Sequence, residues 1–183
     1  MTKYILVLLS TLLIAIQGKS QVDYREGTII KLNNDSINCL INFRGDMDNA
    51  LRCIYRSDSD TSNVYYPKDI LGYKFKNGKH YISKFLKTKK GKDQLFAEYL
   101  IQGKKNLYYY RDFSVYHFLI DYKQDTLVEL PYKEETINKD GRNYLKVSKG
   151  YIGSLKAYFS DCPELFPRID NLKKPDFNNL ISL

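Results

Sequence analysis

Residue types that commonly hold metals or act as nucleophiles are scarce in this chain. Its histidines are His80 and His117, and its cysteines are Cys39, Cys53 and Cys162. A zinc site needs three or four ligands at short spacings such as CxxC or HExxH, and neither spacing occurs. His117 lies in an alternating, strand-like run, so we interpret it as a structural histidine. We expect no metal and no other cofactor.

Carboxylates are the other candidates for chemistry, because a pair of them can hydrolyse a glycosidic bond. The acids that could supply such a pair are Glu98, Asp112, Glu129, Glu134 and Glu135. No GxSxG nucleophile motif occurs, and the run KTKKGK at 87–92 lacks the leading glycine of a phosphate-binding loop. We therefore expect a protein that is not an enzyme. A glycan-directed hydrolase that uses a carboxylate pair remains the alternative.

Basic and aromatic residues crowd the middle third of the chain. Lys and Arg number 29 against 21 Asp and Glu, which gives a formal charge of +8, and there are 17 Tyr and 9 Phe. Lysines interleaved with aromatic rings can attract anions and stack on flat ligands. The predicted binding surface consists of Tyr73, Lys74, Lys76, Lys84, Lys89, Lys90, Lys92, Tyr108 and Tyr110. In the alternative interpretation, the lysines protect exposed strands from aggregation and the aromatic rings fill the core.

The first 20 residues are typical of a secretory signal peptide. Lys3 provides a positive start, residues 4–16 form an uncharged apolar run, and Gly18 and Ser20 are small residues before a cleavage site. The run is too short to span a bilayer, which takes about 20 residues. Removal of residues 1–20 takes away two lysines and no acid, so the charge falls to +6. The sequence predicts an exported protein that is periplasmic, outer-membrane-associated or secreted, with no transmembrane segment in the mature chain.

Export bears on both the cysteines and the partners. Cys39 and Cys53 lie in alternating apolar runs, and we interpret them as core thiols, although a bridge between them is an alternative in an oxidising compartment. An exported protein rarely meets nucleic acid, so we expect none as a partner. An envelope glycan, an anionic lipid headgroup or an envelope protein fits the location better.

Residues 21–131 favour an antiparallel β domain. Period-two runs rich in β-branched and aromatic residues predict about eight to nine strands in a meander, a sandwich or a partly rolled sheet. Turns are predicted at Asn33–Asp35, at Asn77-Gly78 and at Lys123–Asp125. The class is therefore mainly β, or α+β, with short connections.

Residues 132–183 form a predicted linker and C-terminal helical segment packed on the same domain. The linker is the polar stretch 132–142. Apolar residues at helical spacing predict a helix over 148–160. Asp161 and Pro163 favour a new helix start, in which Asp161 is the cap. A last helical turn is expected over 176–183.

Four segments in order resemble a family of exported envelope proteins of certain Gram-negative bacteria, for which no activity is established. They are the hairpin Gly27–Ile41, the segment YPKDILGY at 66–73, LYYYRD at 107–112 followed by His117-Phe118, and YFSDCPEL at 158–165. The resemblance implies an envelope location and a β-rich domain with a helical end, and it implies no activity. In physical terms the shared residues read as fold determinants: Pro67 ends a strand, Asp69 accepts backbone hydrogen bonds and Gly72 permits close packing.

Overall fold

A computed structural model describes residues 22–57, 61–76 and 78–183. The predicted signal segment and Asn77 therefore lie outside the described residues. The strands are β1 (Tyr24–Lys31), β2 (Ser36–Asn42), β3 (Cys53–Arg56), β4 (Ser62–Tyr65), β5 (Ile70–Phe75), β6 (His80–Thr88), β7 (Gly91–Ile101), β8 (Leu107–Asp112), β9 (Val115–Lys123), β10 (Thr126–Glu129), β11 (Lys133–Lys139) and β12 (Arg142–Ser148). The helices are α2 (Asp46–Leu51), α3 (Gly150–Tyr158), the 3-10 turn η1 (Pro163–Leu165), α4 (Phe166–Asp170) and α5 (Phe177–Ile181). The mainly β class predicted from the sequence is confirmed.

Ten of these strands form one sheet that is rolled at one end. The strand order is β10-β9-β8-β7-β6-β5-β1-β2-β3-β4, and β10 also pairs with β6. That second pairing closes β6 to β10 into a small five-stranded barrel, while β5 and β1 to β4 continue from β6 as an open sheet. The pairing is antiparallel as predicted, except between β10 and β6, which are parallel.

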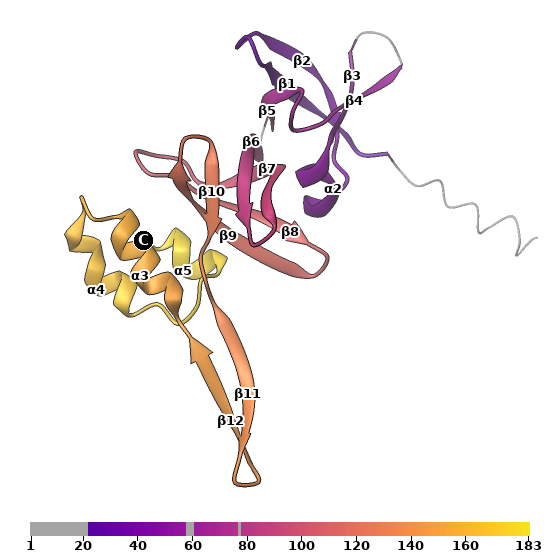
Figure 1. Ribbon diagram of the computed structural model, residues 1–183. Coiled ribbons are helices and arrows are strands. Elements are labelled where there is room, and N and C mark those ends of the chain that lie inside the picture. Colours follow the sequence, from indigo (N-terminus) through magenta and orange to yellow (C-terminus); the bar gives the residue numbers. More distant parts are fainter. Residues whose placement is uncertain (1–21, 58–60, 77) are drawn as a thin grey trace, which may run out of the picture.

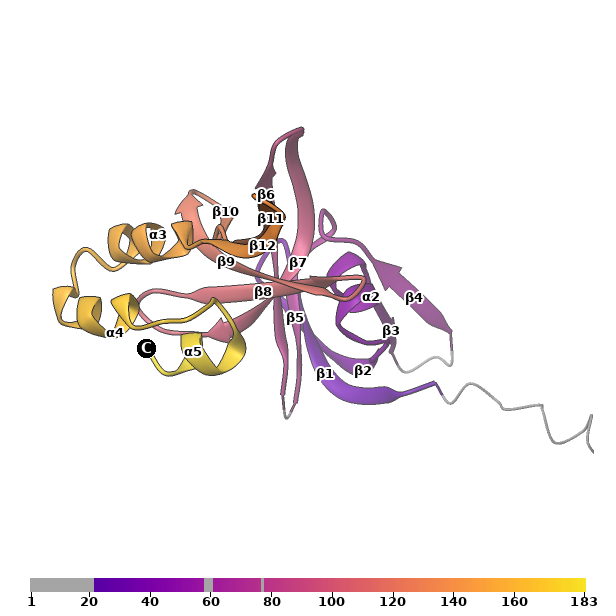
Figure 2. The same cartoon turned by 90° about the horizontal axis from the view of Figure 1, so that it is seen from below.

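Three apolar cores follow from this arrangement. One lies under the open sheet and includes Ile29, Ile41 and Tyr73, and a second fills the barrel around Leu86 and Leu119. The third lies between the outer faces of β8 and β9 and the C-terminal helices. Figures 1 and 2 show the resulting order, with α3, α4 and α5 on one side of the barrel and the open sheet with α2 on the other.

Most predicted turns are where the sequence placed them. Asn34 adopts a left-handed φ of 67° between β1 and β2, and Gln124 has a φ of 30° between β9 and β10. The strands that flank Asn77-Gly78 pair as a hairpin, with Lys74 opposite His80. The predicted helix over 148–160 is α3, and the expected last turn is α5, which Asp176 caps through the amide of Asn179.

Two expectations for the C-terminal part are wrong. The stretch 132–142 is no linker: it enters a hairpin formed by β11 and β12, which projects from the body of the molecule (Figure 1). Nearly all its residues are exposed, so no buried face imposes the apolar alternation that reveals a strand. Asp161 does not cap the next helical turn, because its carboxylate binds Lys105 at 3.0 Å and Cys162 takes the cap position.

Gly72 is required by close packing between β5 and β6. A Cβ atom at this position would lie 2.3 Å from the carbonyl oxygen of Tyr81, which belongs to the paired strand. The same addition at Gly153, in α3, would meet no atom within 4 Å.

We predict that Gly72→Ala lowers the free energy of unfolding by about 2 kcal/mol, because the strands must separate to admit the methyl group. Gly153→Ala is the matched control and should raise stability by about 0.5–1 kcal/mol, since alanine favours a helix over glycine. Urea denaturation of both variants measures the difference. Equal stability of Gly72→Ala and the wild type would contradict the packing argument.

Candidate functional site

The tyrosines of the predicted binding surface do not form a surface. Tyr73 is 0% exposed and Tyr108 is 1% exposed, so both belong to the core. Tyr73 donates a hydrogen bond to the Asn49 carbonyl at 2.6 Å, and the Tyr108 hydroxyl lies 3.2 Å from Asp121. Tyr110 is half-buried and stacks on His117. In an alternating strand the rings point inward while the neighbouring lysines point outward, which is the alternative that the sequence left open.

The lysines of the predicted surface are divided among three places. Lys74 lies on β5 and Lys76 directly follows it, whereas Lys89, Lys90 and Lys92 lie around the turn between β6 and β7. Lys74 is opposite His80, the first residue of β6, whereas the turn follows its last residue. At 3.3 Å per residue these groups are about 25 Å apart along the strand.

Lys84, which lies on β6, occupies the third of these places. Its ammonium lies 3.1 Å from Asp125 and 3.7 Å from Asp121, and its side chain is only 12% exposed. These ion pairs hold it at the barrel, away from both of the other lysine groups.

A groove of about 770 Å³ collects Lys74 and Lys76 with residues that sequence reasoning did not single out. The register explains the grouping, since Thr28 on β1 is opposite both Lys74 and Asn38, and Leu40 is opposite Arg56. These residues therefore share the outer face of the open sheet. The groove is lined by Glu26, Gly27, Thr28, Asn38, Cys39, Leu40, Arg56, Ser57, Lys74 and Lys76.

The charge of the groove is predominantly positive. Three cations, Lys74, Lys76 and Arg56, face one acid, Glu26, which forms an ion pair with Lys76. Arg56 also lies over the ring of Tyr24, at 4.2 Å from its centroid. Around these charges the groove presents hydroxyl and amide groups, among them Thr28, which donates to the Asn38 side chain at 3.0 Å. The arrangement suits a negatively charged ligand that also carries hydrogen-bonding groups.

The Glu26–Lys76 pair separates this groove from a second hollow of about 560 Å³. Its other lining residues include Arg25, Phe75 and Lys79. Arg25 lies over the ring of Phe43, at 4.2 Å from its centroid, and also forms an ion pair with Asp23.

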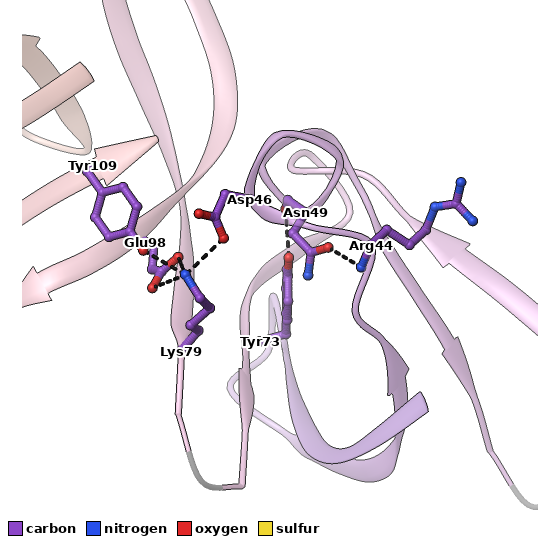
Figure 3. Close-up of polar contacts among 7 residues, drawn as sticks. All are labelled: Arg44, Asp46, Asn49, Tyr73, Lys79, Glu98 and Tyr109. Atoms are coloured by element: carbon purple, nitrogen blue, oxygen red, sulfur yellow. Dashed lines mark hydrogen bonds and ion pairs between the residues drawn. The ribbon is translucent and has the colours of Figure 1, made fainter. Parts of the chain in front are cut away.

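Lys79 is the centre of a polar cluster that joins four parts of the chain (Figure 3). Its ammonium donates to Asp46 at 2.9 Å, to both oxygens of Glu98 at 2.8 and 3.0 Å, and to the Tyr109 hydroxyl at 2.7 Å. Asp46 begins α2, Glu98 belongs to β7 and Tyr109 to β8, while Lys79 itself precedes β6. Asn49 adds a further tie, since its side chain accepts from the Arg44 amide and its carbonyl accepts from Tyr73.

The charges of this cluster are paired with one another. Burial by itself would lower the pKa of Lys79, but hydrogen bonds to Glu98 and Asp46 outweigh it and raise the pKa above its ordinary value. A nucleophilic lysine needs the opposite shift. The two carboxylates hold one ammonium between them, in the space where a glycosidase would hold the scissile bond. The cluster therefore stabilises the fold by joining α2, β7 and β8, and its lysine and carboxylates are all engaged in hydrogen bonds.

The other acids that the sequence offered for a hydrolytic pair are found with different partners. Glu129 binds the His117 ring at 2.7 Å. Glu134 and Glu135, on the projecting hairpin, bind Tyr132 and Lys133. Asp112 ends β8 and is exposed.

The His, Cys, Asp and Glu residues of the described ranges form neither a metal-binding group nor a disulfide. Residues 22–57, 61–76 and 78–183 contain no group of three or more His, Cys, Asp and Glu placed to hold a metal ion. All three cysteines are free, which confirms Cys39 and Cys53 as thiols. Burial raises the pKa of Cys39 to about 11, so the thiol beside the groove is protonated at neutral pH.

Sequence reasoning missed Asp46, Asn49 and Lys79. Helix α2 has only six residues, too few for a helical period, and its residues DMDNAL carry no apolar stripe. Lys79 stood among the many lysines of the middle third, and nothing in the sequence distinguishes it from exposed neighbours. Glu98 was named as an acid, and its low exposure of 5% could have been suspected from Phe96 and Ala97 before it.

Comparisons of the chain with protein-family models, with curated proteins and with solved structures give no match. In the part of the chain that the structure describes, no helix is long and apolar enough to cross a bilayer.

We predict that Lys79→Met destabilises the protein by about 3 kcal/mol, because it leaves the buried Glu98 carboxylate without its cation. Lys76→Met is the matched control. It also removes a lysine from an ion pair, but both partners are exposed, so its effect should be much smaller. Urea denaturation tests the pair, and similar midpoints for both variants would show that the Lys79 cluster contributes little.

We also predict cooperative unfolding at alkaline pH. Burial and then the Glu98 charge raise the pKa of Tyr81, and burial with the Glu98 hydrogen bond raises that of Tyr109. A raised pKa favours the neutral phenol in the folded state, so this stabilisation is complete below pH ~10 and is lost as pH rises above it. Lys79, whose pKa is also raised, acts in the same direction.

Absorbance at 295 nm and circular dichroism, followed together from pH 8 to 13, test this prediction. The buried tyrosines should ionise in one step that coincides with the loss of secondary structure. Protein unfolded in guanidinium is the control, in which all tyrosines should titrate near pH 10. Complete phenolate formation with intact dichroism would contradict the prediction.

Proposed function

We propose that this protein is an exported envelope module that binds an anionic ligand in the groove over β5, β1, β2 and β3, without catalysis. The observation that carries the proposal is the set of cations that β5, the turn after it and β3 place around one groove. Lys74 is exposed. Lys76 forms an ion pair with Glu26, which also lines the groove, and both members of this pair are exposed, so both lysines are accessible to a ligand. A sheet that needed only to stay soluble would not need to gather its charges around a hollow.

The proposed location rests on the sequence. The charged start, the apolar run and the small residues of the first 20 positions support export, and the resemblance to exported envelope proteins supports the same compartment. In that compartment the abundant anions are carboxylates and phosphates of glycans and lipid headgroups. We place the protein with the family that it resembles on these grounds.

The chemistry of the groove narrows the ligand to a class. Lys74, Lys76 and Arg56 would bind anionic oxygens, and Thr28 and Asn38 would exchange hydrogen bonds with hydroxyl groups. An acidic glycan and an anionic lipid headgroup both present anionic oxygens beside hydroxyls. The experiment must therefore distinguish these two sources.

We predict that the protein binds a fluorescent oligogalacturonate, and that Lys74→Glu weakens this binding about tenfold, measured by anisotropy at low salt. Reversal of one groove charge both removes an attraction and adds a repulsion. Affinity should fall between roughly 50 and 500 mM salt, since exposed charges are screened over that range. Vesicles with and without phosphatidylglycerol form the second arm. Binding to the vesicles that contain phosphatidylglycerol, without binding to the oligogalacturonate, would identify a lipid headgroup as the ligand.

Two controls locate the site. Lys173→Glu makes the same charge change on an exposed residue of the C-terminal segment and should leave affinity unchanged. Lys90→Glu tests the turn between β6 and β7. If Lys90→Glu weakens binding and Lys74→Glu does not, the ligand binds at the turn and the groove proposal is wrong; absence of binding in both arms also overturns it.

A further inference from the structure

The hairpin of β11 and β12 is a separate two-stranded sheet. Apolar side chains are exposed on it, namely Ile137 at 42%, Tyr144 at 48%, Leu145 at 64% and Val147 at 38%. A lone hairpin with both faces in water is only marginally stable. Among the described residues no third strand pairs with it, so its edges carry unpaired backbone groups.

The register fixes which backbone groups face outward. Asp140 and Gly141 form a two-residue turn with positive φ at both positions, and Lys139 is opposite Arg142. A turn of this type is flanked by a hydrogen-bonded pair, and such pairs alternate along an antiparallel ladder. The free amides and carbonyls on the outer edge of β12 therefore belong to Asn143, Leu145 and Val147. On β11 they belong to Glu134, Thr136 and Asn138.

The two edges differ in how well each fits a second copy of itself. If two β11 edges paired about Thr136, Lys133 of each copy would stand opposite Lys139 of the other, and like charges in that position repel. If two β12 edges paired about Leu145, the two Leu145 side chains would be opposite each other. Asn143 would face Val147, and Tyr144 would face Lys146, with no like charges opposed.

We propose that β12 is a self-association edge, through which two copies of this chain form a four-stranded antiparallel sheet β11-β12-β12-β11 about a two-fold axis at Leu145. Each outward group of β12 then meets a matching outward group of its partner. On one face of this sheet the two Leu145 side chains are adjacent and are flanked by the Thr136 side chains of both copies. This inference does not depend on the groove or its ligand.

Analytical ultracentrifugation of the full chain tests the proposal. One pair of edge strands is a small interface, so the dimer should be weak and should dissociate on dilution. Leu145→Lys places two ammonium groups opposite each other and should raise the dissociation constant at least tenfold. Thr136→Lys, which adds the same charge to the neighbouring strand, should leave most of the association intact.

Cross-linking gives a second, independent measurement. In a hydrogen-bonded antiparallel pair the Cα atoms are about 5.5 Å apart, within the range of a disulfide. Leu145→Cys should therefore oxidise to a covalent dimer on a non-reducing gel. Thr136→Cys is the matched control, since three strand spacings, about 14 Å, would separate the two copies of that residue.

Three results would overturn the proposal. One is a single-chain mass at every concentration up to about 1 mM, a range in which a weak edge dimer would form. The second is equal cross-linking of Thr136→Cys and Leu145→Cys. The third is dissociation by Thr136→Lys as strong as that by Leu145→Lys.

Discussion

The arrangement of the other elements depends on the hydrogen bonds that the Lys79 ammonium makes. Asp46, Glu98 and Tyr109 reach it from α2, β7 and β8, which are far apart in the sequence. A buried carboxylate such as Glu98 is tolerated only beside a cation, so the position of β7 fixes that of Lys79. The position of Lys79 in turn fixes where α2 begins, and the covered side of the open sheet follows from it.

Strands β6 and β7 each contribute buried residues from both of their faces, so one sheet borders two cores. Tyr81 and Phe96 face the core under the open sheet, whereas Leu86, Leu95 and Ala97 face the interior of the barrel. Beyond β6 the sheet has only one covered face. Its outer face is free to carry Lys74, Thr28 and Asn38, and the groove exists because the sheet changes from two-sided to one-sided burial at β5.

The sequence predicts the strands well because burial on one face imposes alternation, as in β5, where Tyr73 and Phe75 are buried and Lys74 is exposed. Where no face is buried, as in β11, that signal is absent, and the sequence predicts a linker over 132–142 in place of the strand. Lys74 alternates with Tyr73 and Phe75 along β5, but alternation alone does not say which of these side chains faces outward. The parallel pairing of β10 with β6 and the hydrogen bonds of Lys79 to Asp46, Glu98 and Tyr109 join residues that are far apart in the sequence. A local sequence pattern contains no information about such contacts.

The closure of the barrel has a consequence for the order in which the chain folds. Every other neighbour in the barrel is joined by a short turn, but Leu86 and Leu127 meet across roughly 40 positions, through a strand of only four residues. Pairing residues so far apart in the sequence carries a larger loop-closure cost than pairing across a short turn, so we expect the β6–β10 seam to be the last part of the barrel to assemble. The same seam is the place where amide protons of the barrel should exchange with solvent first, well before those between β6 and β7.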